Sequence, residues 1–241
     1  MKILKFAIYS ALFAVVLSSC KKDLDLLPTD SITPGNAFRT LDDAQLAVNG
    51  AYGRYTAILN TIYATSLVTD ESKLGKDNSG QGALTYRYQY SSDPTTGGDV
   101  TGGYSGFYFV IDQANRVLGA LPNVTVAPSE ETRRNTVKGQ MLALRAIAHF
   151  DLLQSFAKSY SAADPKGVAY MKVSDPTAKP ARLTVGESVT NIENDLLEAY
   201  NLSPNVTGAS FSDTVLNKVS IDAYRAKVAL YKGEYQNAIN Y

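Results

Sequence analysis

The chain has 241 residues, with 23 basic and 23 acidic side chains, so its formal net charge at neutral pH is zero. A balanced charge argues against a nucleic-acid-binding protein, because such a protein needs a basic surface. The single histidine excludes a site that needs several histidine ligands, and the single cysteine excludes an internal disulfide. A chain of this length buries a sizeable core and forms one or two domains.

The N-terminus has the parts of a secretory signal. Two lysines precede an apolar run at 6–17, and small residues follow up to Cys20. The run is too short to span a bilayer, which takes about 20 apolar residues. Leu-Ser-Ser-Cys resembles the bacterial lipobox, so we expect a lipoprotein signal peptide at 1–19 and a lipid on Cys20. An ordinary signal peptide with an incidental cysteine is the alternative.

Two helices and a long loop are predicted after a polar tether at 20–34. The first helix starts at Thr40, where Thr40 and Asp43 match a capping box. The second helix covers 58–68. Residues 73–103 are rich in glycine and are predicted to be loop, and a loop of this length is often functional.

The central part of the chain is predicted to be helical. Residues 104–121 carry apolar side chains at spacings of three and four, and this helix ends at Pro122. The next helix begins near Ser129, which is expected to cap it, and continues through 141–158. The stretch 141–158 has no glycine or proline and has a broad apolar face. We therefore expect this helix to be the central packing element.

The last third is predicted to be a connector followed by paired helices. An extended connector at 159–182 leads to a helix whose start, Thr184 and Glu187, is a capping box. A helix at 219–231, a Gly-x-Tyr turn and the opening of another helix follow the pattern of tetratricopeptide repeats. A repeat helix needs a partner to bury its apolar face, so we expect the chain to be an N-terminal piece of a longer protein. A natural terminal helix is the alternative.

Several of these segments resemble one family. The central helix reads ALRAIAHFDLLQSFAKSY and is followed by KGVAYM, the first helix reads FRTLDDAQLAVNGAYGRY, and the helix before the central one reads GYSGFYFVIDQANRVLGALP. In this order they resemble the SusD/RagB family of lipid-anchored, surface-exposed nutrient-binding proteins of Bacteroidetes. Asn115 matches the family pattern. Tyr104 stands where a tryptophan is usual, and Ala169 replaces a proline in the Gly-Val-Pro-aromatic turn.

The resemblance implies a mainly α fold, a tetratricopeptide-like helical scaffold with long irregular loops, in which 35–241 is an incomplete SusD-like N-terminal region. It also implies a lipoprotein at the cell outer membrane that binds a glycan and delivers it to a SusC-type TonB-dependent transporter. No catalysis and no cofactor are expected. Peptide capture, as in the RagB branch, is an alternative. A lipid-anchored hydrolase with its site beyond Tyr241 and a purely structural scaffold are two others.

The candidate ligand residues lie in or beside the predicted loop. Sugar and peptide sites combine aromatic faces with a few hydrogen-bonding side chains. Alternation at 86–90 predicts either a strand or a loop that displays three rings on one side. We expect ligand contacts from Asp77, Asn78, Tyr86, Arg87, Tyr88, Tyr90 and Tyr104. The alternative is that most of these rings pack the loop onto the helices.

Two other features are expected to have no role in chemistry. His149 lies within the long helix, where a histidine with satisfied hydrogen bonds in the core is expected. Asp93, Asp99 and nearby carbonyl groups match no calcium-binding loop in their spacing.

Overall fold

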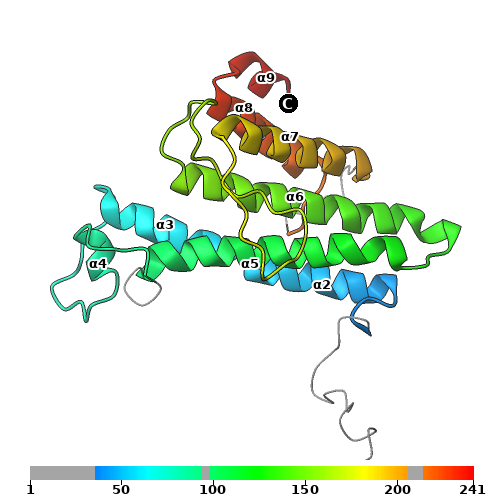
Figure 1. Cartoon of the computed structure of the whole chain (residues 1–241), viewed down its shortest axis with the longest axis horizontal. Helices are drawn as coiled ribbons and strands as arrows, with labels where there is room; N and C mark the ends of the chain where they lie inside the picture. Colours follow the sequence, from blue (N-terminus) through cyan, green and yellow to red (C-terminus); the bar gives the residue numbers. More distant parts are fainter. Residues whose placement is uncertain (1–35, 94–97, 206–213) are drawn as a thin grey trace, which may run out of the picture. The chain divides into compact units, whose positions relative to one another are not determined.

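A computed structural model describes residues 36–93, 98–205 and 214–241 (Figure 1). The predicted signal peptide, Cys20 and the tether at 20–34 lie outside the described residues. The chain divides into two units, Met1–Ala37 and Phe38–Tyr241, and the description below concerns the second. Its helices are α2 (Leu41–Arg54), α3 (Ala57–Val68), α4 (Ala83–Tyr86), α5 (Gly98–Ala120), α6 (Glu131–Phe156), α7 (Val185–Leu202), α8 (Lys218–Lys232) and α9 (Tyr235–Asn240), and 3-10 turns lie at Leu121–Asn123 and Pro128–Glu130.

Helix α6 is the central packing element, as predicted. It lies between α5 and α7, and α8 packs mainly on α7 while also contacting α6 (Figure 1). Every residue of α6 from Gly139 to Leu153 is buried, polar side chains included. Helices α2, α5, α7 and α8 each bury an apolar stripe, so the architecture is a mainly helical stack with irregular connections.

Three helices begin with the capping boxes that stabilise a helix N-terminus. In the predicted box, Thr40 Oγ1 accepts a hydrogen bond from Asp43 N at 3.2 Å, and Asp43 Oδ2 accepts one from Thr40 N at 2.8 Å. The box at Thr184 and Glu187 is also confirmed. Asn217 forms a third box at the start of α8, which the sequence reading missed.

The predicted cap at Ser129 is wrong. A 3-10 turn at Pro128–Glu130 precedes α6, so Ser129 lies inside the turn, and the cap position is Glu130, which makes no capping hydrogen bond through its side chain. Proline favours the first position of a helical turn, because its φ is fixed near the helical value. Pro128 therefore starts the helical turn before Ser129 can cap it.

The prediction of loop throughout 73–103 is also wrong. Helix α4 lies within this segment, and α5 begins at Gly98. Two of the glycines that suggested a loop, Gly102 and Gly103, lie where α5 approaches α3. A Cβ on Gly103 would lie 2.9 Å from Thr61 Oγ1, and one on Gly102 would lie 3.4 Å from Asn60 Nδ2. These glycines permit close helix packing, which outweighs their low helix propensity.

The strand alternative for 86–90 is excluded as well. Tyr86 ends α4, and Tyr88 has a left-handed backbone with φ of 57°. Gln89 N donates a hydrogen bond to Leu84 O at 2.8 Å, which closes the segment into a turn. The three rings consequently do not share one side of an extended chain.

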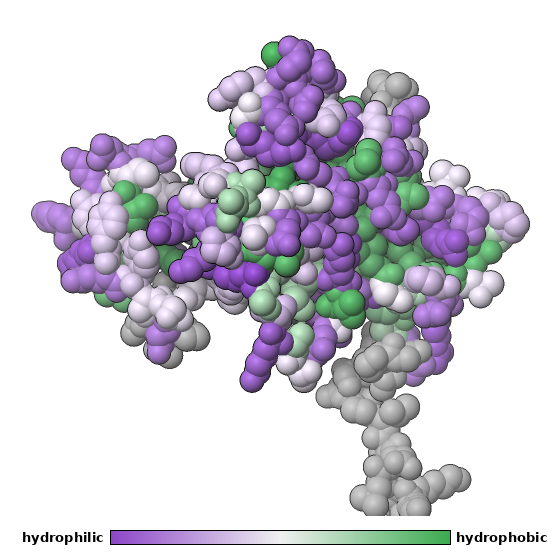
Figure 2. All heavy atoms as spheres, turned by 45° about the horizontal axis from the view of Figure 1, so that its top comes forward, coloured by the Kyte–Doolittle hydropathy of each residue, from purple (hydrophilic) through white to green (hydrophobic). Residues whose placement is uncertain are grey.

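The predicted helix–turn–helix at the end of the chain is confirmed. Gly233 ends α8 with φ of 77°, and α9 follows directly. No helix in the described part of the chain combines the length and apolar character that a membrane crossing requires. On the face shown in Figure 2, hydrophilic side chains dominate, and hydrophobic ones emerge in separate groups between them.

Candidate functional site

A buried ion pair fixes the centre of the fold. Arg145 of α6 donates from Nε and Nη2 to the two carboxylate oxygens of Asp195 of α7, at 2.7 and 2.8 Å. Arg145 also donates from Nη1 to Asn115 Oδ1 of α5 at 2.9 Å. Hydrogen bonds from both ends of the guanidinium make this pairing strong and geometrically specific. The pair therefore ties three helices together.

The same network holds the connector that follows α6. Asn115 Nδ2 donates to Met171 O at 3.0 Å, and Met171 N donates to His149 Nε2 at 3.0 Å. The Tyr170 hydroxyl donates to Asp195 at 2.6 Å, and its ring stacks on His149 with centroids 3.8 Å apart. Both backbone groups of Met171 are thus bound to helix side chains, so this part of the connector has a fixed position.

His149 is a core histidine with satisfied hydrogen bonds, as predicted. Because Nε2 accepts a hydrogen bond, the ring proton lies on Nδ1, which donates to Arg145 O at 2.8 Å. Burial lowers the pKa of His149 to about 3, since the charged form is poorly solvated there. The ring is therefore neutral at physiological pH.

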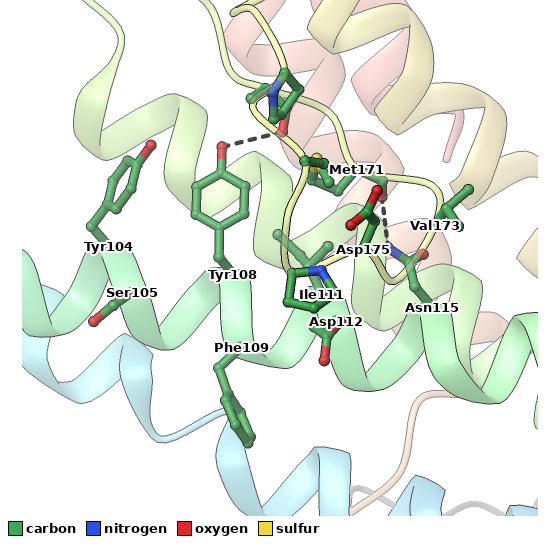
Figure 3. A pocket seen from close by; sticks show the side chains of 14 residues that line it. Tyr104, Ser105, Tyr108, Phe109, Ile111, Asp112, Asn115, Met171, Val173 and Asp175 are labelled. Atoms are coloured by element: carbon green, nitrogen blue, oxygen red, sulfur yellow. Dashed lines mark hydrogen bonds between the residues drawn. The ribbon is translucent and has the colours of Figure 1, made fainter. Parts of the chain in front are cut away.

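The fixed connector and α5 enclose a hollow of about 490 Å³, which we call the connector hollow (Figure 3). This volume lies in the range of small-molecule sites. Its lining comes from α5 and from the connector: Tyr104, Ser105, Tyr108, Phe109, Ile111, Asp112, Asn115, Ala169, Met171, Val173, Asp175, Pro176, Ala178 and Pro180.

The aromatic side chains of this hollow differ in freedom. Tyr104 is 45% exposed, and its ring meets Tyr108 and Phe156 at centroid distances of 5.0 and 5.1 Å. The Tyr108 hydroxyl donates to Ala169 O at 3.1 Å (Figure 3). Phe109 points to the opposite side of α5 from Tyr108 (Figure 3). Tyr104 is therefore the ring that is both exposed and held in place by its neighbours.

Two carboxylates lie beside the rings. Asp112 accepts hydrogen bonds from Ser174 Oγ at 2.5 Å and from Arg116 Nε at 2.7 Å. Asp175 accepts from Thr177 in its own turn, and these hydrogen bonds lower the pKa of its carboxyl. An aromatic face next to oriented carboxylates suits a ligand that carries both apolar C–H faces and hydroxyl groups.

A second hollow, of about 520 Å³, lies where α3, the start of α5 and the end of α6 meet. We call it the helix-end hollow. Tyr90, Asp99, Asp151 and Lys227 contribute its aromatic and charged groups. The other lining residues are Ile58, Thr61, Ala64, Thr65, Val68, Thr85, Val100, Gln154, Ser155 and Phe156.

The seven candidate residues from the sequence do not converge on one site. Tyr104 lines the connector hollow, and Tyr90 lines the helix-end hollow. The side chain of Asn78 is bound within its own turn, because Nδ2 donates a hydrogen bond to Gln81 O and Oδ1 accepts one from Gly80 N. The neighbouring Asp77 is exposed.

The remaining three candidates surround the end of α4. Tyr88 donates from its hydroxyl to Val68 O at 2.6 Å, which fixes the turn onto α3. Tyr86 and Arg87 are exposed and line neither hollow. The alternative in which rings pack the loop onto the helices therefore describes Tyr88 correctly.

Sequence reading missed most of the lining residues. Tyr108 and Asp112 lie one and two helical turns after Tyr104, so their spacing of four places them on the same side of α5. This spacing is the sequence signal that could have identified Tyr108 and Asp112 as neighbours of Tyr104. Asp151 and Lys227 come from distant segments, and no local pattern connects them. Across the described ranges, His, Cys, Asp and Glu side chains form no group of three that could hold a metal ion.

Comparison with known proteins identifies the family. A family model described as "Starch-binding associating with outer membrane" matches residues 24–230. The chain belongs to this SusD-like family, and the resemblance seen in the sequence is confirmed. Its fold is accordingly the helical, tetratricopeptide-like scaffold of SusD-superfamily proteins.

Individual relatives agree with this assignment. The chain is 26% and 25% identical to two SusD-like proteins of Formosa agariphila, over 92% and 97% of its own length and 41% and 44% of theirs. It therefore spans less than half the length of these curated relatives.

Solved structures share the fold. A SusD-superfamily structure from Bacteroides thetaiotaomicron matches with a TM-score of 0.71 and 25% identity, over 83% of this chain and 44% of that one. A Bacteroides vulgatus protein to which sugar binding is provisionally attributed matches with a TM-score of 0.69 and 26% identity, over 85% of this chain and 45% of that one.

Proposed function

We propose that this chain is part of a cell-surface lipoprotein that binds an oligo- or polysaccharide and delivers it to a SusC-type TonB-dependent transporter of the outer membrane. Membership of a family described as starch-binding and associated with the outer membrane supports both the ligand class and the location. The role is binding and transfer, without catalysis.

The observation that carries the ligand proposal is the connector hollow. An exposed ring at Tyr104 packs against the apolar face of a sugar, and the Asp112 and Asp175 carboxylates accept hydrogen bonds from its hydroxyl groups. The buried network around Arg145 holds the connector side of this hollow in place, so little ordering is needed when the ligand binds. The other sequence candidates, Tyr86, Arg87, Asp77 and Asn78, are proposed as outer contacts for a longer glycan.

Glycan binding is tested with the full-length protein lacking its signal peptide. Binding to a panel of neutral polysaccharides is measured by affinity electrophoresis and then by calorimetry. Tyr104→Ala is expected to weaken binding about tenfold, since stacking on an aromatic side chain is lost. Tyr235→Ala is the matched control, because Tyr235 is 69% exposed and lines neither hollow. If no polysaccharide binds, or if both variants bind like the wild type, the connector hollow is not the site.

The anchor and the partner need a separate test. The proposed acylation of Cys20 predicts a hydrophobic protein that partitions into detergent and becomes soluble in a Cys20→Ser variant. Extraction of the native outer membrane in mild detergent is expected to recover the protein together with a large β-barrel transporter. Recovery of the wild-type protein alone would contradict the delivery proposal and leave glycan binding to be judged by the first test.

A further inference from the structure

The helix-end hollow contains a buried carboxyl group whose hydrogen-bonding capacity is only partly used. Asp151 is 5% exposed and lines the hollow. Within the described part of the chain, the Tyr55 hydroxyl is the only donor to it, and it binds Oδ2. A buried carboxyl group normally has several partners, because its desolvation is costly. Burial raises the pKa of Asp151, as expected for a carboxyl group with few donors around it.

A cation also lines the same hollow. Lys227 of α8 lines it, and its Nζ lies 5.6 Å from the ring centroid of Phe150 and 5.8 Å from that of Tyr224. The charge of Lys227 acts to lower the pKa of Asp151, and within the described part of the chain no salt bridge joins these two side chains. The ammonium group therefore has donors available for a ligand in the hollow.

The rest of the lining indicates the class of ligand. Asp99 and Asp151 together offset the charge of Lys227, so an anionic ligand is disfavoured. Tyr90 is 43% exposed and presents an aromatic ring, and Ile58, Val68 and Val100 supply apolar surface. Hydrogen-bond acceptors and donors beside an aromatic ring suit an uncharged, hydroxyl-rich ligand.

The helix-end hollow is separate from the connector hollow but adjoins it. Tyr104 lines one hollow and Phe156 lines the other, and their rings meet edge to face with centroids 5.1 Å apart. This ring pair forms the partition between the hollows. Two neighbouring units of one ligand, or two separate ligands, can therefore be held on its two sides.

We propose that the helix-end hollow is a second carbohydrate subsite, in which Asp151 and Lys227 bind the hydroxyl groups of an uncharged sugar unit and Tyr90 packs against its ring. This inference rests on the proposed glycan-binding function and extends it to a site that shares no lining residue with the connector hollow.

Radical footprinting of the full-length protein, with and without a saturating neutral oligosaccharide, tests the subsite. Mass spectrometry reads the labelling of Tyr90, Tyr104 and Tyr235 separately. We expect the glycan to reduce labelling of Tyr90 and Tyr104 at least threefold, and to leave Tyr235 unchanged. Protection of Tyr104 without protection of Tyr90 would overturn the second subsite and leave the proposed function intact. No binding and no protection at either residue would overturn both.

Variants supply the second measurement. Lys227→Met removes the ammonium group and keeps most of the side-chain stem, and it is expected to weaken oligosaccharide binding about tenfold, as does Tyr90→Ala. Lys76→Met is the matched control, because Lys76 is exposed and lines neither hollow. Lys227 and Tyr90 are exposed side chains, so Lys227→Met and Tyr90→Ala are expected to fold like the wild type, which circular dichroism checks. Wild-type affinity in Lys227→Met and Tyr90→Ala would overturn the subsite.

Discussion

At the scale of single residues, the Arg145–Asp195 pair has the clearest energetic consequence. The two side chains are 8% and 7% exposed, so removing one charge leaves the other buried without compensation. Asp195→Ala is expected to lower the free energy of unfolding by about 3–5 kcal/mol, measured by urea denaturation. Glu198→Ala is the control, since its pair with Lys138 is exposed and contributes less than about 1 kcal/mol. Equal losses in the two variants would contradict a special role for the buried pair.

His149 makes stability depend on pH in a defined direction. Its pKa is about 3 in the folded chain and 6.5 when solvated, so below pH 6.5 the unfolded chain binds the proton first. The contribution is fully present above pH 6.5 and is lost as the pH falls toward 3, by up to about 1.4 kcal/mol per pH unit.

Urea titrations between pH 7 and 5.5 check this expectation. Histidine is the side chain whose ordinary pKa lies in this window, and the chain has one. Asp151, whose pKa is raised by burial, contributes alike to the wild type and to a His149 variant, so the difference between the two isolates His149. His149→Gln keeps a donor and an acceptor at this position but does not titrate, so its stability should vary less over the window. The same slope in the variant and the wild type would show that His149 does not cause the dependence.

At the scale of elements, the contact between α3 and α5 depends on glycine. Gly103 faces Thr61, whereas a Cβ on Gly119 of the same helix would meet nothing within 4 Å. Gly119→Ala is therefore expected to stabilise the protein by about 0.5–1 kcal/mol, because alanine is the better helix former. Gly103→Ala is expected to destabilise it, and adding Thr61→Ala should restore part of the loss. Stabilisation by Gly103→Ala alone would contradict the close contact.

Some helix boundaries are predicted correctly from the sequence and others are not, and the difference has physical reasons. Capping boxes and apolar stripes are local signals, so the starts at Thr40 and Thr184 and the dominance of α6 were predictable. The cap prediction at Ser129 is wrong because Pro128 starts a 3-10 turn one residue earlier. The start of α5 was misread because glycine signals both loops and close packing, and only the position of Thr61 distinguishes the two.

At the scale of the whole molecule, the candidate sites depend on contacts between distant segments. The sequence predicts Tyr90 and Tyr104 as candidate ligand contacts, but it does not show that they line different hollows. The connector hollow exists because Asn115 and His149 hold a segment 22 to 56 residues away. Such long-range hydrogen bonds have no periodic signature along the chain, so the site could be predicted only as a set of candidates.

The fold suits the proposed binding function. A rigid helical layer holds the connector through buried hydrogen bonds, and the side chains that line the proposed site are carried on α5 and on that connector. The proposed site thus combines one helix with one irregular segment, and both are supported by the fixed core. Substitutions in the lining residues should alter affinity with little effect on stability, while substitutions in the buried network should alter both.

The most direct test of the central claim is an experimental structure of the full-length protein with the neutral oligosaccharide that it binds most tightly. The account predicts an ordered sugar ring packed on Tyr104 in the connector hollow, with hydroxyl groups bonded to Asp112 or Asp175. An ordered sugar bound elsewhere, with the connector hollow empty at saturating ligand, would contradict it.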